Sequence, residues 1–335
     1  MSEYLLNIQN ERLSFFTPAG EVKALNDVSF HLNDGEVLGI VGESGSGKSV
    51  TAYSLMGLTA YTGKLIGGTL DFNGHSINDM TEKELRKIRG NEVSIIFQDP
   101  MTSLNPVYTV GNQIREVILL HTNKTKKEAN ERAKELLTLV GISEPEKRLK
   151  QYPHELSGGM RQRVMIAIAL ACEPKLLIAD EPTTALDVTI QAQIIELMME
   201  LKEKLGMAII MITHDLGVVA NMCDRIAVMY AGKIVEYGAV DDIFYHPSHE
   251  YTKGLLRSIP KLNEKEHTRL VPIEGTPVDM LNPPKGCPFA PRCDSCMKIC
   301  LQEMPEYTNV SDVHYSACWL LQKAEYEKAQ GGAAR

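Results

Sequence analysis

The segment between residues 37 and 51 contains residue types that can hold a chain of phosphates. An apolar run leads into Gly42-x4-Gly47-Lys48-Ser49, and glycines let successive backbone N–H groups face an anion. In this pattern the lysine reaches the β- and γ-phosphates, and the serine hydroxyl binds Mg²⁺. The sequence therefore predicts a nucleoside-triphosphate site at the start of a helix. The loop residues expected to line it are Gly42, Ser44, Gly45, Ser46, Gly47, Lys48, Ser49 and Val50.

Two adjacent carboxylates, Asp180 and Glu181, follow a second apolar run at residues 176–179. Acidic side chains at the end of a buried strand are costly unless a cation or a reaction requires them. We expect Asp180 to hold Mg²⁺ through water, together with Ser49 and Gln98. We expect Glu181 to polarise the water that attacks the terminal phosphate.

Gln98 and His214 each end a further apolar run, at residues 93–97 and 207–213. In an open α/β sheet, side chains at the carboxyl ends of the strands face the ligand crevice. Gln98 is therefore predicted to touch water or metal, although a glutamine alone is a weak signal. His214 is predicted to belong to the same site, against the alternative that a lone histidine is only structural.

A second helix start with exposed backbone amides is predicted at Ser157-Gly158-Gly159, which precedes an apolar stretch. Such a start can bind an anion. Taken alone, the same three residues could simply cap the helix.

An aromatic residue on the strand before the phosphate-binding loop could stack on adenine. Phe15 is the first candidate and Phe16 the second. The alternative for either ring is a place in the hydrophobic core.

The elements that must position these residues are also visible in the sequence. Alternating apolar residues favour a strand at 5–16, and residues 21–32 are predicted to form two short strands. An Asn-Gly turn at 73–74 closes another strand. Thr81 is expected to cap a short helix through a capping box, and a long helix is expected at 188–205.

Composition bounds the class of protein. With 335 residues, the chain suggests two domains, or one large domain with an appendage. The formal net charge of −8 argues against a nucleic-acid binder, which usually needs a basic face. No apolar run approaches the roughly 18 residues that suggest a membrane span, and no secretory signal precedes the first strand. These features favour a cytoplasmic chain.

Five of the seven cysteines lie between residues 287 and 318. In a reducing compartment such clustering indicates metal or cluster binding before disulfides. Thiolates in fours bind either Zn²⁺ or an iron–sulfur cluster. Zinc ribbons favour C-x2-C pairs at both ends, and only Cys293 and Cys296 have that spacing. An iron–sulfur cluster, zinc and free structural thiols remain as alternatives.

Together these motifs resemble the nucleotide-binding subunit of an ATP-binding-cassette (ABC) transporter. The resemblance covers roughly residues 5–250 and rests on G-E-S-G-S-G-K-S (42–49), Gln98, L-S-G-G-M-R-Q-R (156–163), L-L-I-A-D-E-P (176–182), A-L-D (185–187) and His214. It implies an α/β cassette at 1–255, with a RecA-like phosphate-loop core, an antiparallel β subdomain and a helical subdomain at about 105–170. A small Cys-rich extension would follow at 256–335.

A narrower resemblance is to the oligopeptide/dipeptide importer ATPases, a branch that also includes nickel importers. It rests on F-Q-D-P-M-T-S-L-N-P (97–106), on Q-Y-P-H-E-L-S-G-G-M (151–160), and on the cysteine tail. Met160 stands where most of the superfamily has glutamine, and methionine there is frequent in peptide importers. The family positions of the tail cysteines correspond to Cys287, Cys293, Cys300 and Cys318. We expect a [4Fe–4S] cluster on these four, with Zn²⁺ as the second choice and Cys296 as an extra thiol.

The resemblance also implies ATP and Mg²⁺ as cofactors and an assembly at the cytoplasmic face of the membrane. The expected partners are a second, different ATPase subunit, two membrane permeases and an extracellular peptide-binding protein, with no nucleic acid. In a head-to-tail dimer, Ser157 and Gly159 would cover the partner's ATP and Asp187 would couple the two sites. His214 would hold the γ-phosphate. The other alternative class is a soluble iron–sulfur ABC ATPase that acts on nucleic acid or ribosomes.

Overall fold

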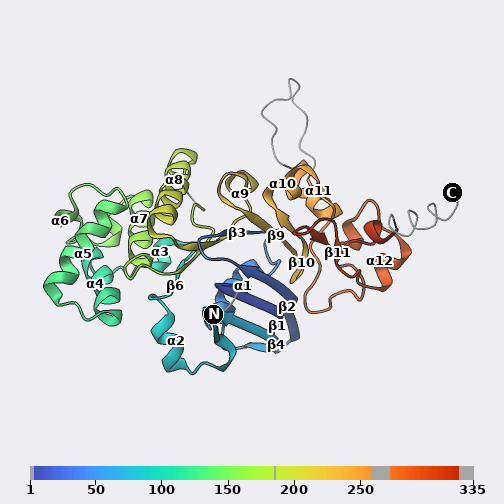
Figure 1. Ribbon diagram of the computed structural model, residues 1–335, viewed down its shortest axis with the longest axis horizontal. Coiled ribbons are helices and arrows are strands. Elements are labelled where there is room, and N and C mark those ends of the chain that lie inside the picture. The colour runs from blue at the N-terminus through green and yellow to red at the C-terminus, as the bar shows by residue number, and fades with distance from the viewer. Residues whose placement is uncertain (1–3, 185, 259–271, 324–335) are drawn as a thin grey trace, which may run out of the picture.

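A computed structural model describes residues 4–184, 186–258 and 272–323 of the chain. Ala185 of the A-L-D motif, residues 259–271 of the expected extension and its last twelve residues lie outside this description. Figure 1 shows a central sheet with a group of helices at one end and the C-terminal extension at the other. None of the described helices is long and apolar enough to cross a membrane.

The central sheet has the strand order β11-β12-β10-β9-β3-β8-β7-β6. The five strands from β9 to β6 pair in parallel, and the remaining pairs are antiparallel. Every residue of β3, β7 and β8 is buried, which explains their unbroken apolar sequences, because both faces of a parallel sheet are covered. The bounds are β3 Val37–Val41, β6 Val93–Ile96, β7 Leu176–Asp180, β8 Ala208–Ile212, β9 Arg225–Tyr230 and β10 Lys233–Ala239.

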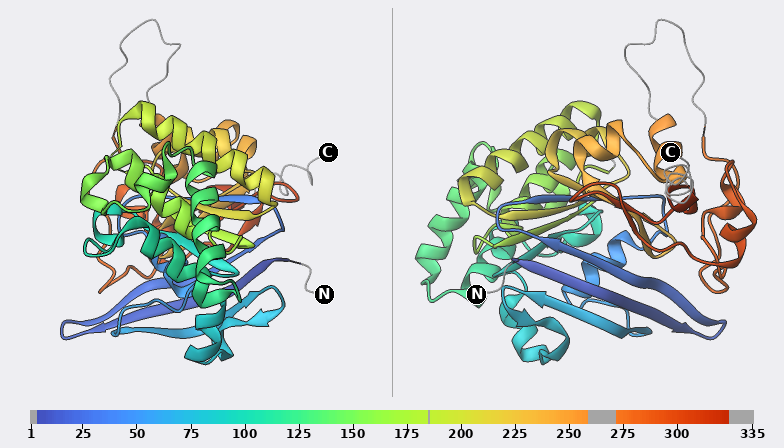
Figure 2. Two further views of the ribbon diagram at one scale, coloured as in Figure 1. Left: turned by 90° about the vertical axis from the view of Figure 1, so that its left-hand side faces the viewer. Right: turned by 45° about the vertical axis from the view of Figure 1, so that its right-hand side comes forward.

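A second, antiparallel sheet has the order β2-β1-β4-β5. It lies on the face of the central sheet opposite α8 and α9 (Figure 2), and the helix that follows β3 packs between the two sheets. Its strands are β1 Leu6–Thr17, β2 Gly20–Leu32, β4 Gly63–Phe72 and β5 His75–Ser76.

The predicted pair of short strands at residues 21–32 is wrong, because β2 is one continuous strand. Asp27, which suggested a break, has φ 59°. It is the extra residue between Asn26 and Val28, which pair with Arg12 and Glu11 of β1. The strand therefore absorbs Asp27 as a bulge and continues.

The helices fall into two groups. One group packs together at one end of the molecule around α7: α3 Pro100–Ser103, α4 Val110–His121, α5 Lys126–Leu139, α6 Pro145–Arg148 and α7 Gly158–Ala169. The other α-helices that precede the extension are α1 Lys48–Leu55, α2 Glu82–Ile88, α8 Val188–Leu205, α9 Leu216–Met222, α10 Val240–Tyr245 and α11 Glu250–Arg257. The predicted capping box at Thr81 is confirmed, since Thr81 and Glu84 exchange the expected bonds at the start of α2.

The described part of the extension contains three short elements besides the 3-10 turn η3 (Ala290–Arg292), namely α12 Lys298–Gln302, β11 Thr308–Asn309 and β12 Tyr315–Ser316. β12 pairs with β10 and so joins the central sheet. The carboxylate of Glu236 in β10 is wholly buried and lies 2.8 Å from Nε2 of His314 in the extension. It also accepts the backbone N–H groups of Ser248 and His249. The extension is thus attached to the cassette both by a ladder and by a buried polar contact.

Candidate nucleotide-binding site

The phosphate-binding loop connects β3 to α1 in a shape that only glycine permits at several positions. Gly42, Gly45 and Gly47 have φ values of 153°, 78° and 104°. A Cβ atom at Gly42 would lie 2.2 Å from the carbonyl oxygen of Met229 on β9. The spacing of the glycines in the sequence is therefore a consequence of backbone geometry at this turn.

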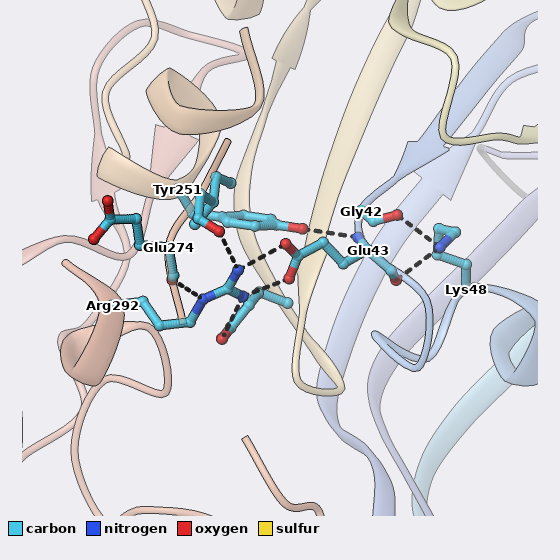
Figure 3. A network of polar contacts seen from close by, with 8 residues as sticks. Gly42, Glu43, Lys48, Tyr251, Glu274 and Arg292 are labelled. Carbon is cyan, nitrogen blue, oxygen red and sulfur yellow. Dashed lines mark hydrogen bonds and ion pairs between the residues drawn. The ribbon is translucent and has the colours of Figure 1, made fainter. Parts of the chain in front are cut away.

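Lys48, the first residue of α1, turns back over the loop. Its side chain is buried, and its Nζ donates to the carbonyl oxygens of Gly42 at 2.7 Å and Glu43 at 2.9 Å (Figure 3). Burial lowers the pKa of Lys48, while the nearby carboxylates of Glu181 and Asp180 oppose that shift. The ammonium group is thus held beside the loop amides, as phosphate binding requires.

Asp180, at the end of β7, contacts two hydroxyl groups of α1. Ser49 donates to its Oδ1 and Tyr53 donates to its Oδ2, each at 2.9 Å. Burial raises the pKa of Asp180, and the two hydroxyls counteract this. The hydroxyl of Ser49 beside a carboxylate is a hard oxygen donor set that fits Mg²⁺.

Tyr53 is a site residue that the sequence analysis missed. Burial, with the neighbouring Asp180, raises the pKa of Tyr53 to about 12, so its hydroxyl stays protonated and donates. The signal was available, because Tyr53 follows Ser49 by four residues and therefore lies on the same face of the helix.

The three predicted catalytic side chains come together at the ends of β6, β7 and β8. Gln98 Nε2 donates to Glu181 Oε2 at 2.8 Å, and His214 Nδ1 lies 3.3 Å from Glu181 Oε1. Thr184, which was not predicted, also donates to Glu181 Oε2, at 2.9 Å. Glu181 has φ 47°, a left-handed conformation that is uncommon outside glycine, and its N–H is bonded to the carbonyl of Ile212 at 2.8 Å. Strain of this kind is found at reaction sites that the surrounding structure holds in place.

The Ser157-Gly158-Gly159 turn begins α7, and Ser157 accepts the N–H of Met160 as its N-cap. A Cβ atom at Gly159 would lie 2.9 Å from a methyl group of Ile190 in α8. The hydrogen bonds of the described residues do not join this turn to the loop of Lys48. The turn packs instead against the start of α8.

Asp187 caps α8 by accepting the N–H of Ile190 at 3.0 Å. Asp187 is exposed, and the adjacent Val188 is 82% exposed. A capping carboxylate beside an exposed aliphatic side chain gives this corner a polar and an apolar contact to offer another molecule.

The two adenine-stacking candidates differ in burial. Phe15 is half-buried and packs against the core between the two sheets. Phe16 is 44% exposed, and Nζ of Lys64 lies 5.6 Å from the centre of its ring. The stacking role of Phe15 stays a prediction.

The four cysteines assigned from the family positions line one pocket, with Phe289, Trp319 and His249 beside them. Cys287, Cys300 and Cys318 are buried, whereas Cys296 is exposed. The described residues contain no group of three or more His, Cys, Asp or Glu side chains arranged to hold a metal ion. The four thiols therefore lie around one pocket, but their arrangement gives no direct support for an iron–sulfur cluster or a zinc site.

Comparison with known proteins decides the family. A family model for "ABC transporter" matches residues 25–184, and one for "Oligopeptide/dipeptide transporter, C-terminal region" matches residues 235–300. The chain is 54% identical over 333 residues to the dipeptide transport ATP-binding protein DppD of Bacillus subtilis (strain 168), covering 99% of each chain. The chain belongs to the oligopeptide/dipeptide branch of ABC transporter ATP-binding proteins.

Other members of this ABC branch agree. The oligopeptide transport ATP-binding protein OppD of Escherichia coli (strain K12) is 57% identical over 304 residues, 91% of this chain and 90% of that one. Among solved structures, the dimeric ATP-binding cassette MJ0796 bound to ADP and Pi superposes with a TM-score of 0.64 at 29% identity, covering 70% of this chain and 98% of the cassette. The predicted α/β ABC cassette fold is confirmed, and the chain is an ABC-type ATPase subunit.

Proposed function

We propose that this subunit hydrolyses MgATP to energise the uptake of dipeptides or oligopeptides across the cytoplasmic membrane. The supporting observation is the convergence of Gln98, Glu181 and His214 at three neighbouring strand ends beside Lys48. The relatives named above are described as dipeptide and oligopeptide transport proteins. This favours peptides over nickel as the cargo and over ribosomes or nucleic acid as the partner.

The residues divide the work of phosphoryl transfer. Lys48 and the loop amides hold the phosphates, and Ser49 with Asp180 would hold Mg²⁺ with help from Gln98. When bound, Mg²⁺ offsets the negative charge of the β- and γ-phosphates. Glu181, fixed by Gln98 and Thr184, accepts a hydrogen bond from the attacking water and aligns it. His214 donates to the γ-phosphate, so catalysis consists of positioning and charge stabilisation.

Each ATP site is completed by a second ATPase subunit. In this chain the Ser157-Gly158-Gly159 turn packs against Leu186 and Ile190 at the start of α8. Ser157 and Gly158 are exposed, so the helix start is accessible to a nucleotide held by another subunit. The helix start would close over the partner's ATP, and exposed Asp187 would couple the two sites. The related cassette MJ0796 is described as a dimer.

We infer further partners from the same branch. A different ATPase subunit, two permeases and an extracellular peptide-binding protein would make up the assembly, with this chain peripheral at the cytoplasmic face.

The assembled transporter in liposomes tests the proposal. Hydrolysis of ATP inside the liposomes should rise when the peptide-loaded binding protein is added outside, and labelled peptide should accumulate. Nickel with the same binding protein should stimulate nothing. Hydrolysis that responds to RNA or ribosomes but not to peptide would contradict the proposal.

We also infer that Cys287, Cys293, Cys300 and Cys318 hold a [4Fe–4S] cluster, with Zn²⁺ as the alternative. The support is that four thiols from separate segments line one pocket, which is the donor set of such clusters. Protein purified without oxygen should contain iron and sulfide and show the broad visible absorbance of a cluster. Cys300→Ser should abolish this absorbance, whereas Cys296→Ser should retain it. Zinc alone would support the alternative, and a folded, metal-free protein would contradict both.

A further inference from the structure

The C-terminal extension contacts the phosphate-binding loop through an ion pair between Arg292, which is buried, and Glu43, which is partly buried. We propose that Arg292 is a positioning residue that holds this loop through Glu43, so that the extension sets the affinity of the site for nucleotide. The inference rests on the proposed ATP site and concerns a residue that neither anchors phosphate nor takes part in hydrolysis. Arg292 lies one residue before Cys293, and 249 residues separate it from Glu43.

The guanidinium group of Arg292 uses all its donors. Its two terminal nitrogens bond the two carboxylate oxygens of Glu43 at 2.5 and 2.9 Å (Figure 3). The remaining N–H groups bond the hydroxyl of Tyr230 and the carbonyl oxygens of Ile273 and Glu274, at 2.8 to 3.2 Å. The side chain is only 4% exposed. Bidentate pairing with a carboxylate fixes orientation as well as charge, so Glu43 has a defined anchor.

Glu43 is held at three points. Besides its carboxylate, its backbone N–H donates to the hydroxyl of Tyr251 on α11 at 2.8 Å. Its carbonyl accepts from Nζ of Lys48 at 2.9 Å. Because Glu43 is the first residue after Gly42, this grip fixes the point at which the loop leaves β3. The position of Glu43 therefore sets the direction of the backbone N–H groups that follow it in the loop. The ammonium of Lys48 bonds the carbonyl of Gly42, which belongs to the same peptide unit as the N–H of Glu43.

Charge gives a second reason for the pairing. Glu43 places a carboxylate on the loop that is proposed to bind the phosphates of ATP. Because like charges repel, an unpaired carboxylate there would weaken the binding of phosphate. The guanidinium neutralises this carboxylate, which points toward Arg292 and away from Lys48 (Figure 3). Loss of Arg292 would therefore loosen the loop and also leave an unpaired negative charge, 27% exposed, on the phosphate site.

An aromatic cluster around Phe289 of the extension supports the position of Arg292. Phe289, three residues earlier, packs against Tyr230 and Tyr251 with ring centres 5.4 and 5.3 Å away. Phe289 also lines the pocket of the four cysteines. The N–H of Arg292 bonds the carbonyl of Phe289 at 2.9 Å. One aromatic cluster thus connects the thiol pocket to the residue that holds the loop.

The test is the dissociation constant of MgADP from the purified full-length chain, measured by calorimetry, with the KM for ATP and kcat in the assembled transporter. Arg292→Gln should raise the dissociation constant and the KM about tenfold or more, with kcat changed by less than about threefold. Glu43→Gln should have a smaller effect, because it removes the ion pair with Arg292 without leaving an unpaired negative charge on the loop. The double variant should recover part of the affinity lost in Arg292→Gln, which a purely structural role does not predict.

Tyr307→Phe is the matched control, because it removes another bond between extension and cassette, from the Tyr307 hydroxyl to the carbonyl of Ile234 at 2.8 Å, away from the loop. It should leave nucleotide affinity unchanged. Wild-type affinity in a folded Arg292→Gln variant would overturn the inference and leave the proposed function intact. If Arg292→Gln does not fold, wild-type affinity in Glu43→Gln has the same meaning. A wild-type chain that binds no MgADP would overturn the proposed function itself.

Discussion

Replacing Glu181 with glutamine should slow ATP hydrolysis by a factor of about 10² to 10⁴, the usual contribution of a positioned general base, without loss of ATP binding. Glutamine has the same size and can still accept from Gln98 and Thr184, so the site keeps its shape. The amide cannot draw a proton from the attacking water. Hydrolysis and ATP binding measured on the same assembled transporter separate the two effects.

The same variant should accumulate in an ATP-bound closed dimer, since hydrolysis is what releases the two subunits. Glu203→Gln, an exposed carboxylate on α8, is the control and should behave as wild type. Normal turnover in Glu181→Gln would show that another group aligns the water.

Replacing Glu11 with glutamine should stabilise the protein at neutral and alkaline pH. Glu11 of β1 is wholly buried, and neither of its carboxyl oxygens has a hydrogen-bond partner among the described residues. Burial raises the pKa of Glu11 from 4.5 to about 7, despite the nearby hydroxyl of Ser54. Below pH 4.5 the group is protonated in both folded and unfolded chains, so it has no effect on stability. Between pH 4.5 and 7 only the unfolded chain loses the proton, so stability falls as pH rises.

Above pH 7 the buried carboxyl should cost about 3 kcal/mol of unfolding free energy, and Glu11→Gln should recover up to that amount. Urea unfolding at pH 5 and pH 8 measures the difference, which should be large only at the higher pH. Glu21→Gln, an exposed carboxylate on the same sheet, should be neutral at both. An equal gain for Glu11→Gln at both pH values would indicate a packing effect instead.

The catalytic cluster could be predicted because its members share one rule. Gln98, Asp180, Glu181 and His214 each follow an apolar run, and the carboxyl ends of parallel strands meet at one side of a sheet. No contact had to be known in advance. The helix expected at 188–205 was confirmed for a similar local reason, since it has a capping aspartate at its start and a glycine at its end.

The remaining features depend on contacts that sequence spacing does not encode. Asp27 is of a type common in turns, yet β2 pairs with β1 on both sides of it, at Asn26 and Val28. The ion pair of Arg292 and Glu43 joins segments 249 residues apart, and neither residue stands out by type. Tyr53 lies beyond Ser49, the last residue of the phosphate-binding pattern, and it reaches Asp180 only because the helix places it on the same face as Ser49.

The short outer strands β11 and β12 of the extension determine what a truncation after the cassette would do to the central sheet. The central sheet ends on β11, which has two residues, and so short an outer strand offers little for another chain to pair with. A fragment ending at the cassette would remove the pairing of β12 with Glu236 and Tyr237 of β10 and deprive Glu236 of His314. We expect such a fragment to self-associate through strand addition at this edge more readily than the full chain.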